Sequence, residues 1–262
     1  MKTITQGYIG PEVEIICKTL GLHEDNTYTA RIEEKVKEYQ GAHGLKVDGV
    51  VGPLTWFPLL YDHRLMTNDS REICESDLSL FSDVLCVSKA ALKSVLEVET
   101  GGKGGFLESG RCRILFEAHI FYKLLKKRGL DPDELSKTHP GIIARKWNKT
   151  LYKGGEDEWD RLTEAMEINE EAALESASWG IFQVMGFNFR DLGCSSVYEM
   201  VDMMGRSEFS QFILGLKYMI THGLIKYLQK KDWAGFAMRY NGPGYKQNNY
   251  DVKLERAYMK YC

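Results

Sequence analysis

The segment LKSVLEVETGG, residues 92–102, places two glutamates in a largely apolar stretch. At 100° per residue, a helix here brings Glu99 onto the apolar side together with Leu92. Glu97 points elsewhere, and with Lys93 it forms an i,i+4 pair suited to a solvated face. The sequence therefore predicts that Glu99, and not Glu97, lies partly out of water.

Glu99 also lies just before Gly101 and Gly102, which are predicted to end this helix. Burial disfavours the charged form of a carboxyl group, so the pKa of a buried glutamate rises. A glutamic acid that stays protonated near neutral pH can donate a proton to a reacting group. Glu99 is therefore the first candidate for a general acid.

The composition is that of a soluble globular protein and favours no charged partner. The chain has 262 residues, of which 44% are hydrophobic and 27% charged, with a formal net charge of -3. No basic surplus exists to attract nucleic acid or an anionic membrane surface. No apolar run approaches the ~18 residues of a membrane span. We therefore expect neither nucleic acid nor membrane as a partner.

The six cysteines and six histidines give no sign of a metal centre or a disulfide framework. The cysteines contain no C-x-x-C pair, which fits buried or free thiols in a reducing compartment. None of them shows metal-ligand spacing with a histidine. We expect no metal and no other cofactor.

The pattern of glycines and apolar residues divides the chain into two helical domains joined by a linker. Short helices with glycine-containing turns occupy residues 1–61, and a polar, poorly periodic segment, residues 62–79, is interpreted as the linker. Residues 80–262 are rich in helical patterns. The strand candidates are 111–116 and parts of 101–110, so we predict a mainly α fold with a small β element.

One motif in the first domain is specific. Residues 36–56, VKEYQGAHGLKVDGVVGPLTW, resemble small three-helix peptidoglycan-binding domains, whose signature is FQ…GL..DG.VGP.TW. The resemblance implies a wall-binding role for Tyr39, Gln40, Leu45, Asp48 and Trp56. Taken alone, apolar residues such as Leu45 and Trp56 at this spacing indicate a small core, and the other matches indicate a turn.

Three further segments join Glu99 as candidates in the second domain. SASWGIFQVMG, residues 176–186, places Gln183 as a lone amide among apolar residues, where a buried amide needs partners. RYNGPGY, residues 239–245, presents Asn241 on a loop fixed by glycine and proline. Tyr258 follows on a terminal helix.

These segments, in this order, resemble the goose-type lysozyme and lytic transglycosylase superfamily, and most closely the N-acetylmuramidase domain of modular phage endolysins. The resemblance implies that Glu99 is the catalytic acid. It implies that substrate is contacted by Gln183, Tyr240, Asn241 and Tyr258. Each polar group has an alternative role as a satisfied buried group, and Tyr240 could stack on a sugar or steady the acid through its hydroxyl.

Glu117 is the candidate second catalytic carboxylate. In LFEAHIF it shares a predicted helical face with Ile120 and Phe121, so burial is expected. It would position water as a base or support Glu99; a structural ion pair or a helix-start acid is the alternative. His119 is two residues away, so on a helix the two side chains would diverge, and we predict a structural role for it.

The resemblance implies an endolysin that hydrolyses the β-1,4 bond between N-acetylmuramic acid and N-acetylglucosamine in peptidoglycan. A lytic transglycosylase that forms a 1,6-anhydro product, and a non-catalytic wall-binding protein, are the alternatives. The N-terminus lacks the apolar core of a secretory signal. Together with this lack, the resemblance implies an enzyme that stays in the host cytoplasm until a separate membrane pore releases it to the cell wall, and we expect a monomer.

Overall fold

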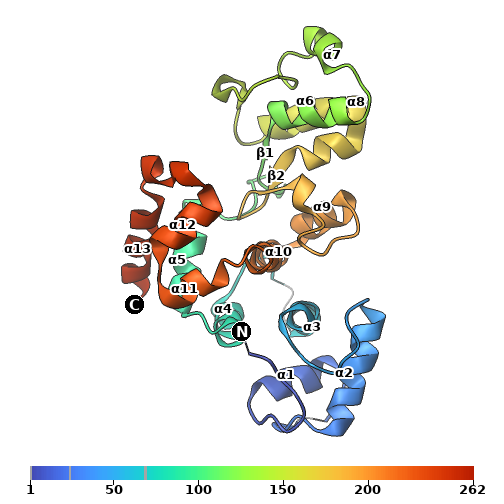
Figure 1. The fold of residues 1–262 in the computed structure, drawn as a ribbon, viewed down its shortest axis with the longest axis vertical. Coiled ribbons are helices and arrows are strands. Elements are labelled where there is room, and N and C mark those ends of the chain that lie inside the picture. Colours follow the sequence, from blue (N-terminus) through green and yellow to red (C-terminus); the bar gives the residue numbers. More distant parts are fainter. Residues whose placement is uncertain (1, 24, 68–69) are drawn as a thin grey trace. The chain divides into compact units, whose positions relative to one another are not determined.

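The computed structural model describes residues 2–23, 25–67 and 70–262 (Figure 1). The chain forms two compact units, Met1–Leu92 and Lys93–Cys262. Helices dominate both units, and the described residues contain a single small sheet, of three strands. The prediction of a mainly α fold with a small β element is confirmed.

The first unit consists of short helices around a core of aliphatic and aromatic side chains. Its helices are α1 (Glu12–Thr19), α2 (Ala30–Ala42), α3 (Pro53–Thr67) and α4 (Glu75–Leu85). Thr29 begins α2 by accepting a hydrogen bond from the backbone of Ile32 at 3.4 Å. The core side chains Val13, Ile16, Val36 and Trp56 are fully buried.

The Asp48-Gly49 turn of this unit is held by one side chain. Gln40, only 1% exposed, accepts hydrogen bonds from the backbone N–H groups of Asp48 and Gly49 at 3.1 and 2.9 Å. Its amide nitrogen donates to Val50 O at 3.1 Å. Gly49 has a φ of +71°, which favours glycine. The motif therefore builds a turn whose backbone groups are hydrogen-bonded by the buried Gln40 amide.

The segment interpreted as a linker is partly helical. Helix α3 continues to Thr67, and α4 begins at Glu75. Arg64 and Asp77, both almost completely buried, form an ion pair at 2.9 Å that ties the two helices together. The predicted linker includes residues 68 and 69, which lie outside the described residues; among the described ones, Arg64 and Asp77 satisfy each other inside the unit. The compact unit extends past the predicted boundary at residue 79, to Leu92.

The second unit surrounds its sheet with helices. It contains α5 (Lys89–Thr100, which begins in the first unit), β1 (Ile114–Phe116), α6 (Ala118–Lys127), α7 (Pro132–Thr138), η1 (Lys149–Leu151), α8 (Asp157–Glu175), β2 (Ala177–Trp179), β3 (Val184–Met185), η2 (Gly186–Asn188), α9 (Val197–Arg206), α10 (Glu208–Thr221), α11 (Ile225–Lys230), α12 (Trp233–Asn241), η3 (Pro243–Asn248) and α13 (Tyr250–Tyr261). Helix α8 packs against β1 and β2, and α6 packs against α8 (Figure 1).

The sheet is antiparallel in the order β1-β2-β3. Leu115 pairs with Ser178, and Trp179 pairs with Val184. The predicted strand at 111–116 is confirmed for its second half, whereas within 101–110 the structure has only an isolated bridge, from Phe106 to Cys112. Trp179 is fully buried in the core.

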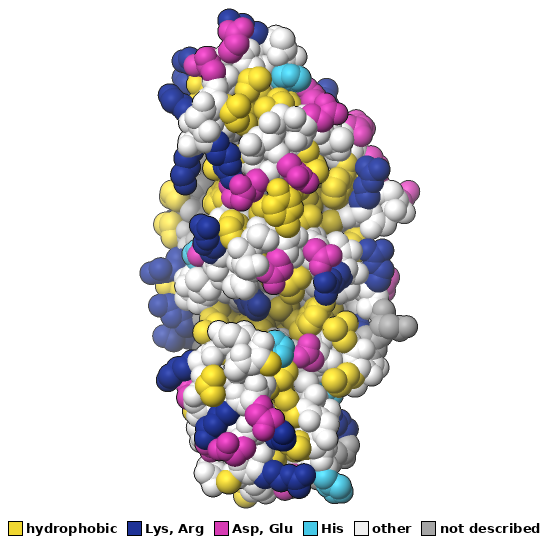
Figure 2. All heavy atoms as spheres, turned by 90° about the vertical axis from the view of Figure 1, so that its right-hand side faces the viewer, with side chains coloured by type: hydrophobic (Ala, Val, Ile, Leu, Met, Phe, Trp, Pro, Cys, Tyr) yellow, Lys and Arg dark blue, Asp and Glu magenta, His cyan; other side chains and the backbone are white. Residues whose placement is uncertain are grey.

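Both signs of charge are present on the surface. On the face drawn in Figure 2, Lys and Arg side chains are interspersed with Asp and Glu, and hydrophobic side chains are exposed between them. Across the described residues, no helix has both the length and the apolarity that crossing a membrane requires.

Candidate active site

Glu99 lies in the last turn of α5 and faces a pocket. The pocket has a volume of about 210 Å³, and its lining includes Glu99, Arg113, Leu115, Gly155, Ile181 and Gln183. Glu99 is partly buried, between full exposure and the core. The structure thus brings Glu99 and Gln183, predicted from segments more than eighty residues apart, to the same cavity.

Two tyrosines hold the Glu99 carboxyl group. The Tyr250 hydroxyl donates a hydrogen bond to Glu99 Oε1. The Tyr240 hydroxyl lies 3.4 Å from Glu99 Oε2 and donates to the carbonyl oxygen of Phe182 at 2.9 Å. Tyr240 is the second-last residue of α12 and Tyr250 is the first of α13, and these helices pack against each other. Asn241, which is exposed, hydrogen-bonds Tyr250.

Burial sets the proton affinity of this carboxyl group. Desolvation raises the pKa of Glu99 to about 7, against the opposing effect of the hydrogen bonds from Tyr250 and Tyr240. Burial and the neighbouring Glu99 raise the pKa of both tyrosines well above the ordinary value, so their hydroxyls remain protonated donors. A glutamic acid with this pKa is a proton donor at neutral pH.

Gln183 occupies the turn between β2 and β3. It is exposed, so the prediction of a buried amide was wrong: the residues around it turn inward while Gln183 faces the pocket. Its φ of +47° is rare for a side chain larger than glycine and costs about 1–3 kcal/mol. Its Oε1 accepts from the Ser178 hydroxyl at 2.9 Å, and its Nε2 donates to Gly180 O at 2.9 Å. These bonds fix the amide at the pocket wall.

Gln211, which the sequence analysis did not single out, hydrogen-bonds two backbone segments beside the pocket, at Ile181 and at Gly105. This side chain is 1% exposed. Its Oε1 accepts from the backbone N–H of Ile181 at 3.0 Å, and its Nε2 donates to Gly105 O at 3.3 Å. A Cβ at Gly105 would lie 1.9 Å from Gln211 Oε1, and one at Gly180 would lie 2.9 Å from the same side chain. The glycines near the pocket are therefore required by the approach of this amide.

Arg113 is a further pocket residue that the sequence analysis missed. Its Nη2 donates to Lys103 O at 3.2 Å, whereas its buried Nε–H has no hydrogen-bond partner among the described residues. A buried donor without a partner is unusual.

Glu117 follows β1 directly and is not part of a helix. Its backbone is extended, with φ −102° and ψ 91°, and α6 begins one residue later. The Tyr152 hydroxyl lies 2.9 and 2.8 Å from the two carboxylate oxygens, and His119 Nδ1 is 3.1 Å from Oε2. The prediction that the side chains of Glu117 and His119 diverge was wrong, because it assumed that both residues are helical.

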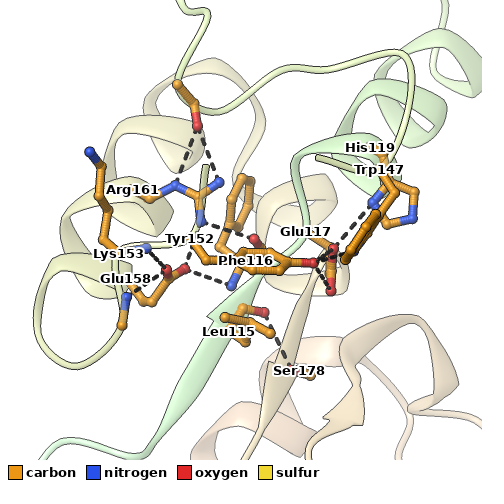
Figure 3. A network of polar contacts seen from close by, with 12 residues as sticks. Leu115, Phe116, Glu117, His119, Trp147, Tyr152, Lys153, Glu158, Arg161 and Ser178 are labelled. Carbon is orange, nitrogen blue, oxygen red and sulfur yellow. Dashed lines mark hydrogen bonds and ion pairs between the residues drawn. The ribbon is translucent and has the colours of Figure 1, made fainter. Parts of the chain in front are cut away.

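A buried ion pair lies beside this cluster (Figure 3). Glu158 in α8 is fully buried and accepts hydrogen bonds from Arg161 at 2.7 Å and from the backbone N–H groups of Phe116, Lys153 and Gly154 at 2.7–3.0 Å. Desolvation opposes its charge, but these three backbone donors and Arg161 hold the pKa of Glu158 below its ordinary value. The pair joins the end of β1 to the loop that contributes Gly155 to the pocket.

Tyr258 is not among the residues that line the Glu99 pocket. Tyr258 is 8% exposed and packs on Trp233, with ring centroids 5.2 Å apart. The tyrosine of α13 that contacts Glu99 is Tyr250, two helical turns earlier.

In the first unit, Trp56 is fully buried, and Tyr39 donates to Asp62 at 2.5 Å. Trp56 and Tyr39, together with Gln40 and Asp48, build the turn and the core of this unit. Leu45 is partly exposed.

Among the described residues, no group of three or more His, Cys, Asp or Glu side chains is arranged to hold a metal ion.

Comparison with known proteins identifies the family of each domain. The N-acetylmuramidase family model matches residues 88–262, and the model of a peptidoglycan binding domain matches residues 17–57. The crystal structure of the Burkholderia AP3 phage endolysin is 37% identical to this chain, covers 99% of both chains and superposes with a TM-score of 0.67. Among curated proteins, none matches the chain. The chain therefore belongs to the N-acetylmuramidase family, and it is a glycoside hydrolase of the modular endolysin type with a peptidoglycan-binding domain in front of its muramidase domain.

Proposed function

We propose that Glu99 is the general acid with which this muramidase hydrolyses the β-1,4 bond between N-acetylmuramic acid and N-acetylglucosamine. The observation that carries the proposal is the position of Glu99 at the wall of a pocket, where burial raises the pKa of its carboxyl group to about 7. The proton passes from Glu99 to the glycosidic oxygen as the C1–O bond breaks. Water then adds to C1, and the proton that it loses restores Glu99 through solvent.

The hydrogen bonds around Glu99 indicate which of its oxygens carries the proton. Tyr250 donates to Oε1, so that oxygen acts as an acceptor. The Tyr240 hydroxyl donates mainly to Phe182 O at 2.9 Å, so its contact of 3.4 Å with Oε2 is the weaker of its two hydrogen bonds. We assign the transferable proton to Oε2.

Other pocket groups have supporting roles in this proposal. Gln183 and Arg113 would hydrogen-bond sugar or N-acetyl oxygens, and Tyr240, Tyr250 and Asn241 hold Glu99 in place. We assign Glu117 a role in positioning substrate and not in proton transfer, because Tyr152 and His119 hold its carboxylate in a fixed position. The peptidoglycan-binding domain would keep the enzyme on its polymeric substrate and so raise the local substrate concentration.

Mass spectrometry of digested peptidoglycan tests the reaction. Hydrolysis by water gives a product with a reducing N-acetylmuramic acid end. A 1,6-anhydro product, lighter by one water, would instead identify a lytic transglycosylase. Release of peptide stems with intact glycan would contradict both readings.

Tyr250→Phe is expected to shift the pH profile to higher pH. The Tyr250 hydrogen bond stabilises the carboxylate and so lowers the pKa of Glu99; its loss raises this pKa further. Since the acid must be protonated, the alkaline limb of kcat/KM, expected near pH 7 in the unaltered protein, moves upward. Tyr240→Phe should shift the limb less, because its contact is longer at 3.4 Å. A limb that stays fixed or moves downward in Tyr250→Phe would contradict the assignment.

A further inference from the structure

Trp147 is an exposed aromatic ring whose orientation is fixed. It precedes η1 and is 59% exposed. Its indole N–H donates to the Tyr152 hydroxyl at 2.7 Å, and the two rings meet edge to face with centroids 6.4 Å apart. The polar edge of the indole is therefore already bonded inside the protein. What Trp147 offers to solvent is a rigid apolar surface.

Polar groups accompany this ring. The Tyr152 hydroxyl that accepts from Trp147 donates in turn to Glu117, and His119 lies 3.1 Å from the same carboxylate (Figure 3). The side chains of Glu117 and His119 are 16% and 21% exposed, so solvent reaches both. The cluster thus combines an exposed ring with a carboxylate and an imidazole held in fixed positions.

Strand β1 leads from the Glu99 pocket to this cluster. The Glu117 N–H donates to Ser176 O at 3.0 Å, so the β1–β2 ladder continues through Glu117. Side chains alternate along a strand, which puts Leu115 and Glu117 on one face, roughly 7 Å apart. Both Leu115 and Ile114 line the pocket, so Glu117 lies next along the strand on the Leu115 side, just beyond the lining residues.

The loop before α8 also connects the Glu99 pocket to the cluster of Trp147, Glu117 and His119. Gly155 lines the pocket, and Tyr152 lies three residues earlier. The Glu158 carboxylate binds the backbone N–H groups of Lys153 and Gly154 and also that of Phe116. One buried carboxylate therefore holds the loop and the strand together between the pocket and the Trp147 cluster.

We propose that Trp147, with Glu117 and His119, forms an additional subsite for a sugar of the same glycan strand, away from the scissile bond. The inference rests on the proposed function. A pyranose presents a C–H face that packs on an aromatic ring and hydroxyls that bond to a carboxylate or imidazole, the combination found here. Continuity with the Glu99 pocket favours the glycan strand itself as the occupant.

Kinetics on peptide-free glycan strands and on short glycan fragments test the subsite. Trp147→Ala should raise KM for long strands about three- to tenfold, the size expected for loss of one aromatic contact, with kcat unchanged. Fragments too short to reach Trp147 should be cleaved as before, and Trp147→Phe should retain most of the affinity. Tyr198→Ala is the matched control, since Tyr198 is an aromatic 45% exposed on α9.

Three results would overturn the subsite: unchanged KM on long strands, an equal loss on long and short substrates, or a loss seen only with strands that carry peptide stems. A binding measurement separates this inference from the proposed function. Glu99→Gln/Trp147→Ala should bind peptide-free strands three- to tenfold more weakly than Glu99→Gln. That result would support the subsite even if Glu99 proved not to be the acid, and equal binding would refute it.

Discussion

Glu99→Gln is expected to lower kcat on purified peptidoglycan by about 10²–10⁴-fold, the usual contribution of a general acid. The amide has nearly the shape of the carboxyl group and can still accept from Tyr250, so the fold should persist. It has no acidic proton to give to the leaving oxygen. The measurement is initial-rate release of reducing ends at pH 6, where the native residue is mostly protonated.

Glu97→Gln is the matched control for this variant. Glu97 lies two residues earlier on α5 and forms an ion pair with Lys260 at 2.6 Å on the partly exposed side of the helix. Its loss should change kcat less than twofold. Retention of more than a tenth of the native kcat by a folded Glu99→Gln protein would remove Glu99 from the mechanism.

Glu158→Ala is expected to destabilise the second unit by about 3–5 kcal/mol. The substitution leaves the buried Arg161 guanidinium without its carboxylate partner and removes the acceptor of three backbone N–H groups. It also frees the loop that reaches the pocket at Gly155. Urea unfolding of the full chain at pH 7 measures the effect on the transition of this unit.

Glu164→Ala on the same helix is the control for Glu158→Ala. Glu164 is exposed and pairs with His139 at 2.8 Å, so its loss should cost no more than about 0.5 kcal/mol. The double variant Glu158→Ala/Arg161→Ala should cost less than the sum of the single variants, since it removes both charges. A cost below 1 kcal/mol for Glu158→Ala would show that the buried pair is not needed for stability.

The sequence could predict what depends on local periodicity. The stripe through Leu92 and the glycine pair that follows Glu99 were sufficient to predict a partly buried carboxyl group at a helix end. The position of Gln183 near it came from the family resemblance, because nothing in the spacing relates residues that far apart. Strands of two or three residues, such as β2 and β3, are too short to establish the alternating pattern of a sheet.

The site residues that the sequence analysis missed or misplaced depend on tertiary packing. Tyr250 on α13 contacts Glu99 on α5 through tertiary packing, and no local pattern distinguishes it from Tyr258 on the same helix. Glu117 was given helical geometry, whereas the chain is still extended at that residue. Gln211 acts through backbone groups more than a hundred residues away at Gly105. Long-range hydrogen bonds of this kind are fixed by tertiary packing and leave no periodic trace.

The most direct test of the central claim is an NMR titration of the Glu99 side-chain carboxyl group in the full-length protein, assigned by comparison with Glu99→Gln. The structure predicts a midpoint near pH 7, because burial outweighs the hydrogen bonds from the two tyrosines. A midpoint near the ordinary glutamate value of about 4.5 would mean that this carboxyl group is ionised at neutral pH and cannot be the proton donor.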